Sequence, residues 1–265
     1  MQAAVSPSSV VPADQDRQTP RSSIHRLPPG AVNRIAAGEV IERPAAVVKE
    51  LCENAIDAGA RRIDVALDEG GRRLICVTDD GIGMLPSELP LALERHATSK
   101  LTATGDGDVD LLSIETMGFR GEALPSIGAV SRLKISTRTK DADGWALVVQ
   151  GGAMSDPAPA PFAGQGTKVE VRDLFYATPA RLKFLKSDRA ETMAVVDTVK
   201  RLAMARPDIA FALHIDGRQR FSYKAEPQGA EGHLRRLAAI MGRDFGDNAV
   251  PVALERDGVT LSGFA

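Results

Sequence analysis

The sequence ELCEN at residues 50–54 carries the strongest single indication of what this chain is. It lies within residues 44–58, where apolar side chains recur at helical spacing and Gly59 provides a C-terminal stop. Four-residue spacing places Glu50 and Asn54 on one face of this predicted helix, one turn apart. A carboxylate and a carboxamide arranged in this way can hold a water molecule and a hard cation next to each other.

A first glycine-containing segment, DDGIG at residues 79–83, follows an apolar run that predicts a strand. Asp79 should therefore emerge at a strand end, where ligand crevices tend to form. Its carboxylate could accept a hydrogen bond from the amino group of adenine. Gly81 and Gly83 would allow the backbone to approach the ring closely.

A second segment, GFRGEAL at residues 118–124, has the composition of a phosphate cradle. Glycines permit an unusual backbone path, Arg120 supplies positive charge, and successive N–H groups at a helix start point towards an anion. The pattern differs from a Walker motif, because no Gly-Lys-Ser/Thr follows a spaced glycine. The residues that we expect to contact nucleotide here are Gly118, Phe119, Arg120, Gly121, Glu122, Ala123 and Leu124. The polar stretch 98–114 is typical of a lid, and Thr98, Ser99 and Lys100 at its start could reach the phosphates.

Together these segments predict ATP hydrolysis with Mg²⁺. Glu50 would orient and deprotonate the attacking water, and the Asn54 carbonyl oxygen would bind the metal ion. Glu53 is a rival for the catalytic role, and spacing alone does not decide between the two. Each residue also has an ordinary structural interpretation, since a single helix glutamate is usually exposed and an asparagine near a helix end often caps it.

Composition limits the classes of function. The chain has 265 residues, 43% of them apolar, and 33 basic against 35 acidic residues give a net charge of −2. No overall basic field indicates a protein that coats nucleic acid, and no apolar run is long enough to predict a membrane span. The two cysteines, Cys52 and Cys76, lie in apolar patterns typical of buried thiols. No secretory signal is recognisable, so we expect a cytoplasmic protein.

Residues 1–23 are poor in large apolar side chains and predict a disordered tail. Asp216-Gly217 is a strong hairpin signal between two strands. The other expected elements are helices at 31–37 (closed by Gly38), 44–58, 87–95, from about 121, 179–185, 189–205 and 231–241, and strands at 61–67, 74–78, 132–139, 145–150, 167–171, 210–215, 219–223 and 259–264. The final stretch, residues 229–265, is too short to build a hydrophobic core of its own, so it would be the start of a second domain.

Three longer strings resemble one family closely. They are IAAGEVIERPAAVVKELCENAIDAGA (35–60), RHATSK with GFRGEALPSIGAVSR (95–100 and 118–132), and DLFYATPARLKFLK (173–186). The order of the shorter motifs resembles the GHKL ATPases, a group that includes gyrase B subunits, heat-shock chaperones and sensor histidine kinases. The longer strings resemble the MutL and PMS mismatch-repair members of that group, from about residue 24 to the end.

This resemblance implies an α+β fold of the GHKL (Bergerat) type, a two-layer α/β sandwich with a mixed, largely antiparallel sheet. The ATPase domain would cover residues 24–228, and 229–265 would begin a ribosomal S5 domain 2-like domain. In the family, the residue matching Glu50 is the general base and the one matching Asn54 binds Mg²⁺, which favours Glu50 over Glu53. The residue matching Asp79 holds adenine, assisted by Gly166 and Thr167.

The resemblance also implies partners: a MutS-type mismatch-recognition protein, DNA, and a second copy of the chain that joins when ATP orders the lid. Such a protein would act in the bacterial cytoplasm and join the nucleoid during repair. Asp80 stands where many relatives have asparagine. The lysine that reaches the terminal phosphate in the family, much of the DNA groove and the C-terminal dimerisation region are not in this sequence. The alternative interpretation is therefore a nucleotide-gated binding module with little turnover.

Overall fold

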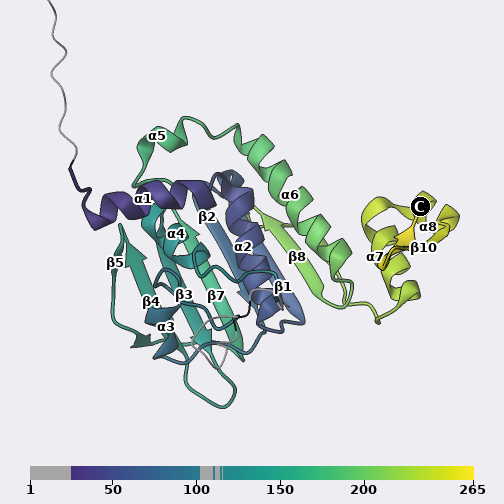
Figure 1. The fold of residues 1–265 in the computed structure, drawn as a ribbon, viewed down its shortest axis with the longest axis horizontal. Coiled ribbons are helices and arrows are strands. Elements are labelled where there is room, and N and C mark those ends of the chain that lie inside the picture. The colour runs from purple at the N-terminus through teal and green to yellow at the C-terminus, as the bar shows by residue number, and fades with distance from the viewer. Residues whose placement is uncertain (1–24, 102–109, 111–113, 115) are drawn as a thin grey trace, which may run out of the picture.

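The computed structural model describes residues 25–101, 110, 114 and 116–265. One large sheet carries helices on one of its faces, and a smaller unit lies beyond the sheet at the C-terminal end (Figure 1). This is the α+β, two-layer arrangement that the sequence predicts. The predicted tail and most of the predicted lid lie outside the described residues.

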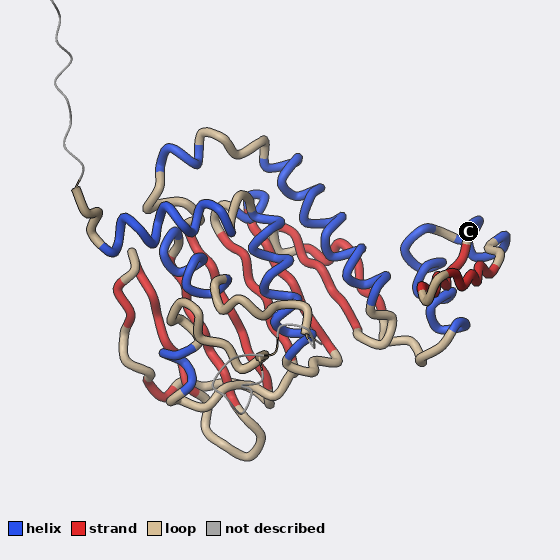
Figure 2. The backbone as a smooth tube through the Cα atoms, in the orientation of Figure 1, coloured by secondary structure: helices blue, strands red, loops and turns tan. Residues whose placement is uncertain are grey.

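The helices of the main body cover the same face of the sheet, as Figure 2 shows. The helices are α1 Pro29–Val40, α2 Pro44–Asp57, α3 Glu88–Leu91, α4 Ala123–Val130, α5 Pro179–Leu182, α6 Asp188–Ala205, α7 Ala230–Met241 and α8 Arg243–Asn248, with a 3-10 turn at Glu69–Gly71. The strands are β1 Arg62–Asp68, β2 Leu74–Asp79, β3 Arg132–Arg138, β4 Trp145–Gln150, β5 Ala153–Met154, β6 Ala158–Pro159, β7 Gly166–Arg172, β8 Ala210–Ile215, β9 Arg218–Tyr223, β10 Pro251–Arg256 and β11 Val259–Phe264. None of the described helices is long and apolar enough to cross a membrane.

The large sheet has the strand order β5-β4-β3-β7-β2-β1-β8-β9, with β6 pairing beside β4. Among the described strands, β1 and β8 form the one parallel pair, and the other neighbours are antiparallel. The sheet is therefore mixed and largely antiparallel, as expected. Strands β2 and β7 lie at its centre, and their register puts Asp79 opposite Thr167. Two residues predicted to contact one adenine thus lie side by side at one strand end.

Helix α2 begins and ends where its sequence predicts. Pro44 occupies the first turn, where its missing N–H costs no hydrogen bond, and Gly59 follows the helix with φ at +72°. The apolar stripe of α2 is buried against the sheet, with Val47, Val48 and Leu51 each no more than 3% exposed. The opposite, polar stripe is left to form a site. Cys52 is a buried free thiol, and Cys76 is a half-buried one.

Three predicted helices have wrong boundaries. The helix expected over 179–185 ends early, because α5 covers only Pro179–Leu182. Gly38 lies inside α1, because the helix continues to Val40 and the glycine allows a close approach by Arg181. A Cβ at Gly38 would lie 2.8 Å from the Arg181 guanidinium. The helix expected over 87–95 is limited to α3, Glu88–Leu91, and residues 92–96 form turns and a bend instead.

The C-terminal unit contains two elements that the sequence reading missed, α8 and β10. Strand β10 pairs antiparallel with β11 around Asp257-Gly258, a hairpin signal of the same kind as Asp216-Gly217. Helix α7 is fastened to the main body by Arg236, which is 1% exposed. Its guanidinium donates to five backbone carbonyls, those of Ala203, Arg206, Pro207, Ile209 and Lys224. Burial lowers the pKa of Arg236 from its ordinary value.

Candidate active site

The polar stripe of α2 carries Glu50, Asn54 and Asp57, spaced by four and three residues. This spacing keeps all three on one side of the helix, away from the stripe that packs on the sheet. The stripe thus contains Asp57 in addition to the two predicted residues, Glu50 and Asn54.

Glu50 and Glu53 have different surroundings. The Glu53 side chain is 9% exposed and accepts a hydrogen bond from Lys49 at 3.0 Å, so its charge is paired within the helix. The Glu50 side chain is 29% exposed, and the same ammonium lies 3.5 Å from its Oε1. Glu50 is therefore the more accessible of the two carboxylates.

Asn54 is engaged by a residue from the start of the predicted lid. The Lys100 Nζ donates to Asn54 Oδ1 at 2.7 Å and to Asp57 Oδ2 at 2.5 Å. The Asn54 carbonyl oxygen therefore binds a cationic group, the property that the predicted Mg²⁺ ligand requires. In the described residues, no group of three or more His, Cys, Asp or Glu side chains forms a metal cluster, so an ion here would rely on Asn54 and on the phosphates.

The start of the 118–124 segment reaches the same end of α2. The Met117 and Gly118 backbone N–H groups donate to the two oxygens of Asp57, at 3.0 and 3.2 Å. The carbonyl of Gly121 accepts from the N–H of His96 at 3.1 Å, which ties the segment to residues 96–100. Three stretches far apart in the sequence thus meet at the C-terminal end of α2.

The remaining residues of the two loops are less directly connected to α2. Arg120 is exposed and its guanidinium packs over the Phe119 ring, 5.6 Å from the centroid. Thr98 accepts from the N–H of Lys100 at 3.1 Å, and Ser99 is exposed. Thr98, Phe119, Arg120 and Glu122 line a hollow of about 410 Å³ together with His96 and Leu101. Ala123 opens α4, and Leu124 packs against the core.

Asp79 ends strand β2, and the segment after it contacts the C-terminal end of α2, where the Ile82 N–H donates to the Ala58 carbonyl at 3.0 Å. The Asp79 Oδ1 accepts from the Gly81 N–H at 2.9 Å. Beyond it, Thr137 Oγ1 lies 3.1 Å from Thr167 Oγ1, and it also accepts from the Met84 N–H at 2.9 Å. A buried hydroxyl pair therefore lines the strand ends next to the predicted adenine residue.

Burial raises the pKa of Asp79 to about 6. The backbone N–H groups of Gly81 and Thr167 lower this pKa in part, because they stabilise the ionised carboxylate, and the nearby charge of Asp80 raises it. An acid in this state is poorly solvated and has unused capacity to accept a hydrogen bond from a ligand.

The geometry around Asp79 depends on Gly166. This glycine has φ at +132°, and a Cβ there would collide with the Asp79 backbone carbonyl. The close packing of β7 on β2 at this point therefore requires glycine.

Asp80, unlike its neighbour Asp79, has a structural role. Its Oδ1 accepts from the backbone N–H groups of Arg61 and Arg62, at 2.7 and 2.8 Å, and so caps the start of β1. An asparagine at this position would offer the same acceptor oxygen.

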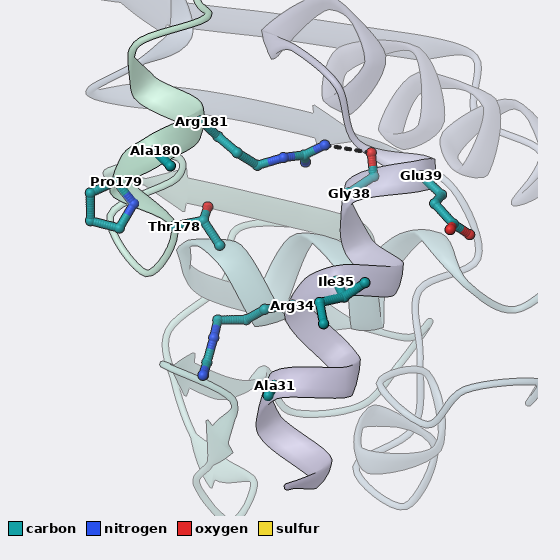
Figure 3. Close-up of a pocket in the computed structure, with 9 residues that line it drawn as sticks. All are labelled: Ala31, Arg34, Ile35, Gly38, Glu39, Thr178, Pro179, Ala180 and Arg181. Atoms are coloured by element: carbon teal, nitrogen blue, oxygen red, sulfur yellow. Dashed lines mark hydrogen bonds between the residues drawn. The ribbon is translucent and has the colours of Figure 1, made fainter. Parts of the chain in front are cut away.

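Another hollow lies away from all these residues. It measures about 530 Å³ and lies between α1 and α5, lined by Arg34, Ile35, Glu39, Thr178 and Arg181 among others. Figure 3 shows Arg181 reaching from α5 to the carbonyl of Gly38, at 2.6 Å. None of the residues predicted to contact nucleotide lines it.

Sequence reasoning missed Asp57 and Thr137. Asp57 could have been found, because it lies seven residues after Glu50 and three after Asn54 on the same helical stripe. Thr137 gave no local signal, since it lies in an ordinary alternating strand whose neighbours are set by the sheet order.

Comparison with known proteins places this arrangement in a family. Residues 42–153 match the family of histidine kinase-, DNA gyrase B- and HSP90-like ATPases. The solved structure of the Aquifex aeolicus MutL ATPase domain complexed with ADP is 30% identical, with a TM-score of 0.66 over 85% of this chain and 77% of that chain. The chain belongs to the MutL family.

Sequence comparison with curated relatives supports the same family. The DNA mismatch repair protein MutL of Phenylobacterium zucineum is 58% identical over 248 residues, which are 91% of this chain and 40% of the relative. MutL of Caulobacter vibrioides is 59% identical over 244 residues, 91% of this chain and 38% of the relative. The chain thus spans about two fifths of the length of these MutL proteins. Its fold is that of the GHKL ATPase region of the family.

Proposed function

We propose that this chain binds ATP with Mg²⁺ at the end of α2 and slowly hydrolyses it to ADP and phosphate. The observation that carries the proposal is the meeting of Asn54 and Asp57 with Lys100 and the Met117 and Gly118 N–H groups at the C-terminal end of α2, one helical turn beyond Glu50. The relative that was solved as an ADP complex supports a nucleotide as the ligand.

Each part of the site then has a role in the reaction. Glu50 takes a proton from a water molecule, whose oxygen attacks the terminal phosphorus while ADP leaves. Asn54 would hold Mg²⁺, which neutralises charge on the phosphates when it is bound. The fit is supported by the Asn54 oxygen, which already accepts from a cationic group at 2.7 Å.

Nucleotide recognition is divided between two groups of residues near the C-terminal end of α2. Asp79 accepts from the adenine amino group, with Gly81, Gly83 and Thr167 shaping the space around the ring. The phosphates would lie against the loop that begins at Gly118 and ends at Leu124, within reach of Thr98, Ser99 and Lys100.

Replacing Glu50 by glutamine tests the catalytic role. Phosphate release should fall by about 100-fold or more, the usual contribution of a general base, while ADP affinity should stay within a few-fold in titration calorimetry. Glu53→Gln is the matched control: it removes the Lys49 ion pair and should reduce stability more than turnover. If Glu53→Gln abolished turnover and Glu50→Gln did not, the assignment of the base would be wrong.

The biological role that we propose is that of the N-terminal region of a MutL protein in DNA mismatch repair, in the bacterial cytoplasm and at the nucleoid during repair. Residues 24–228 would form the ATPase domain and 229–265 the start of a second domain that contributes to a DNA groove. ATP would bring two copies together and couple recognition by a MutS-type protein to strand removal. Size-exclusion chromatography of the full-length protein with and without a non-hydrolysable ATP analogue tests the dimerisation, which should require the analogue.

A nucleotide-gated module with little turnover is a second candidate, favoured by one observation. Lys100 donates to the Asn54 oxygen that the metal would use, so binding of the metal has to break a hydrogen bond first. If the analogue alone supports recruitment of partners at the full level, hydrolysis only resets the protein, and the second description is the better one.

A further inference from the structure

Lys100 is the centre of a small cluster of charged groups at the end of α2. Its ammonium has three N–H donors, and two of them are directed to Asn54 Oδ1 and Asp57 Oδ2 at 2.7 and 2.5 Å. The Lys100 side chain is 20% exposed and that of Asp57 only 6%. A flexible lysine is thus held in one place by two acceptors on successive turns of one helix.

Asp57 joins this cluster to the loop that follows the lid. Both of its oxygens are used: Oδ1 accepts from the Met117 N–H at 3.0 Å, and Oδ2 from the Gly118 N–H at 3.2 Å as well as from Lys100. Gly118 also packs directly on the cluster, since a Cβ there would lie 3.4 Å from Lys100 Nζ and 3.9 Å from Asn54 Oδ1. Little space is left around the ammonium.

A metal ion and this ammonium cannot share the Asn54 oxygen. Mg²⁺ binds its oxygen ligands at about 2.1 Å with strict octahedral geometry. An ammonium 2.7 Å from the same oxygen would stand within a few ångströms of the ion, where two positive charges repel each other in a poorly solvated site. Loading of the metal therefore requires Lys100 to leave Asn54.

We propose that Lys100 is a built-in competitor of Mg²⁺ for Asn54, and that Asp57 is the positioning residue that keeps it there. The inference rests on the proposed nucleotide site and adds its regulation. Without metal, Lys100 satisfies Asn54 and Asp57; when the metal binds, Lys100 gives up its contact with Asn54 and keeps its ion pair with Asp57. Asp57 remains within reach of Lys100 and continues to hold the Met117 and Gly118 N–H groups.

The experiment is a titration of ADP binding against Mg²⁺ concentration, which involves no turnover. In Lys100→Met, the Mg²⁺ concentration that gives half of the metal-dependent gain in ADP affinity should fall by about tenfold, because the metal no longer displaces a charged hydrogen bond. Lys49→Met is the matched control: Lys49 lies on α2 and pairs with Glu50 and Glu53, so it removes one nearby charge without touching Asn54. Its midpoint should change by less than about threefold, the size of a screened through-space effect.

A second measurement observes Lys100 in the unaltered protein. The ammonium held by two acceptors should give a slowly exchanging ¹H–¹⁵N signal, assigned by its loss in Lys100→Arg. This signal should persist with ADP and a chelator and change when Mg²⁺ is added. An unchanged Lys100 signal, or a Lys100→Met midpoint equal to or above that of the unaltered protein, would overturn the competition. If the unaltered protein bound no ADP at any Mg²⁺ concentration, both the proposed function and this inference would fail.

Discussion

Asp79→Asn should make the nucleotide-free protein more stable, although it alters a residue of the proposed binding site. The substitution keeps the shape of the side chain and an acceptor oxygen for the Gly81 N–H, but it removes a charge that burial disfavours. The pKa of Asp79 is raised from 3.8 to about 6 in the folded protein. At 1.36 kcal/mol per unit, this difference corresponds to a penalty of about 3 kcal/mol on the folded state at neutral pH.

The sign of the pH dependence follows from the same pKa. Above about pH 6 the carboxylate is ionised in both states, so the folded protein carries the full penalty. As the pH falls from 6 towards 4, the folded protein binds a proton that the unfolded chain does not, and the penalty disappears. Asp79→Asn should therefore exceed the unaltered protein by about 3 kcal/mol in free energy of unfolding at pH 7.5, with the difference shrinking towards zero near pH 4.

Urea unfolding followed by circular dichroism at pH 7.5, 6, 5 and 4 measures this difference. Asp80→Asn is the control, because it removes one charge from the next residue while keeping the acceptor for the Arg61 and Arg62 N–H groups. Its effect should stay below about 1 kcal/mol, as for most exposed substitutions. The reasoning is refuted if Asp79→Asn is no more stable at pH 7.5, or if its advantage does not decline as the pH falls.

Nucleotide binding should change in the opposite direction in the same variant. An adenine amino group donates more strongly to a carboxylate than to a carboxamide, and charged hydrogen bonds are worth about 1.5–3 kcal/mol. ADP affinity at pH 7.5 should therefore fall by about tenfold or more, measured by titration calorimetry. A gain in stability together with a loss in affinity would identify Asp79 as a residue kept for binding at a cost to the fold.

Two further substitutions test the packing that supports the site. Gly83→Ala should destabilise the protein by on the order of 3 kcal/mol in urea unfolding, because φ is +72° and a Cβ would collide with the Arg138 carbonyl. The control, Gly152→Ala, has φ at +85° but open space around it, so it should cost only about 1 kcal/mol. Equal costs in the two variants would contradict the collision. Arg236→Met should lower the free energy of unfolding by at least about 3 kcal/mol, because it leaves buried carbonyls unpaired. Arg235→Met, at an exposed neighbour, should lower it by less than about 1 kcal/mol. Similar losses of stability in the two variants would contradict the anchoring role of Arg236.

Much of the fold could be predicted because its elements carry local signals. Pro44 and Gly59 bound α2, and Asp216-Gly217 joins two strands whose limits the structure reproduces within a residue. Errors occurred where a contact distant in sequence decided the outcome. Gly38 looks like a helix stop, yet the helix continues, because the glycine serves a guanidinium that arrives from α5.

The site shows the same division between local and distant information. Glu50, Asn54 and Asp79 are marked by their spacing and by adjacent glycines, so the sequence alone identifies them as candidates. No pattern in the sequence indicates that Lys100, 46 residues beyond Asn54, donates to the oxygen that a metal would use. Nor does any pattern indicate that Asp57 accepts hydrogen bonds from both Lys100 and Met117. Those contacts exist because Asp57 lies where α2 ends and accepts N–H groups that no regular structure pairs. The residues proposed to carry out the chemistry can thus be identified from the sequence. The contacts of Lys100 and Asp57 cannot, because they form only when loops distant in sequence come together.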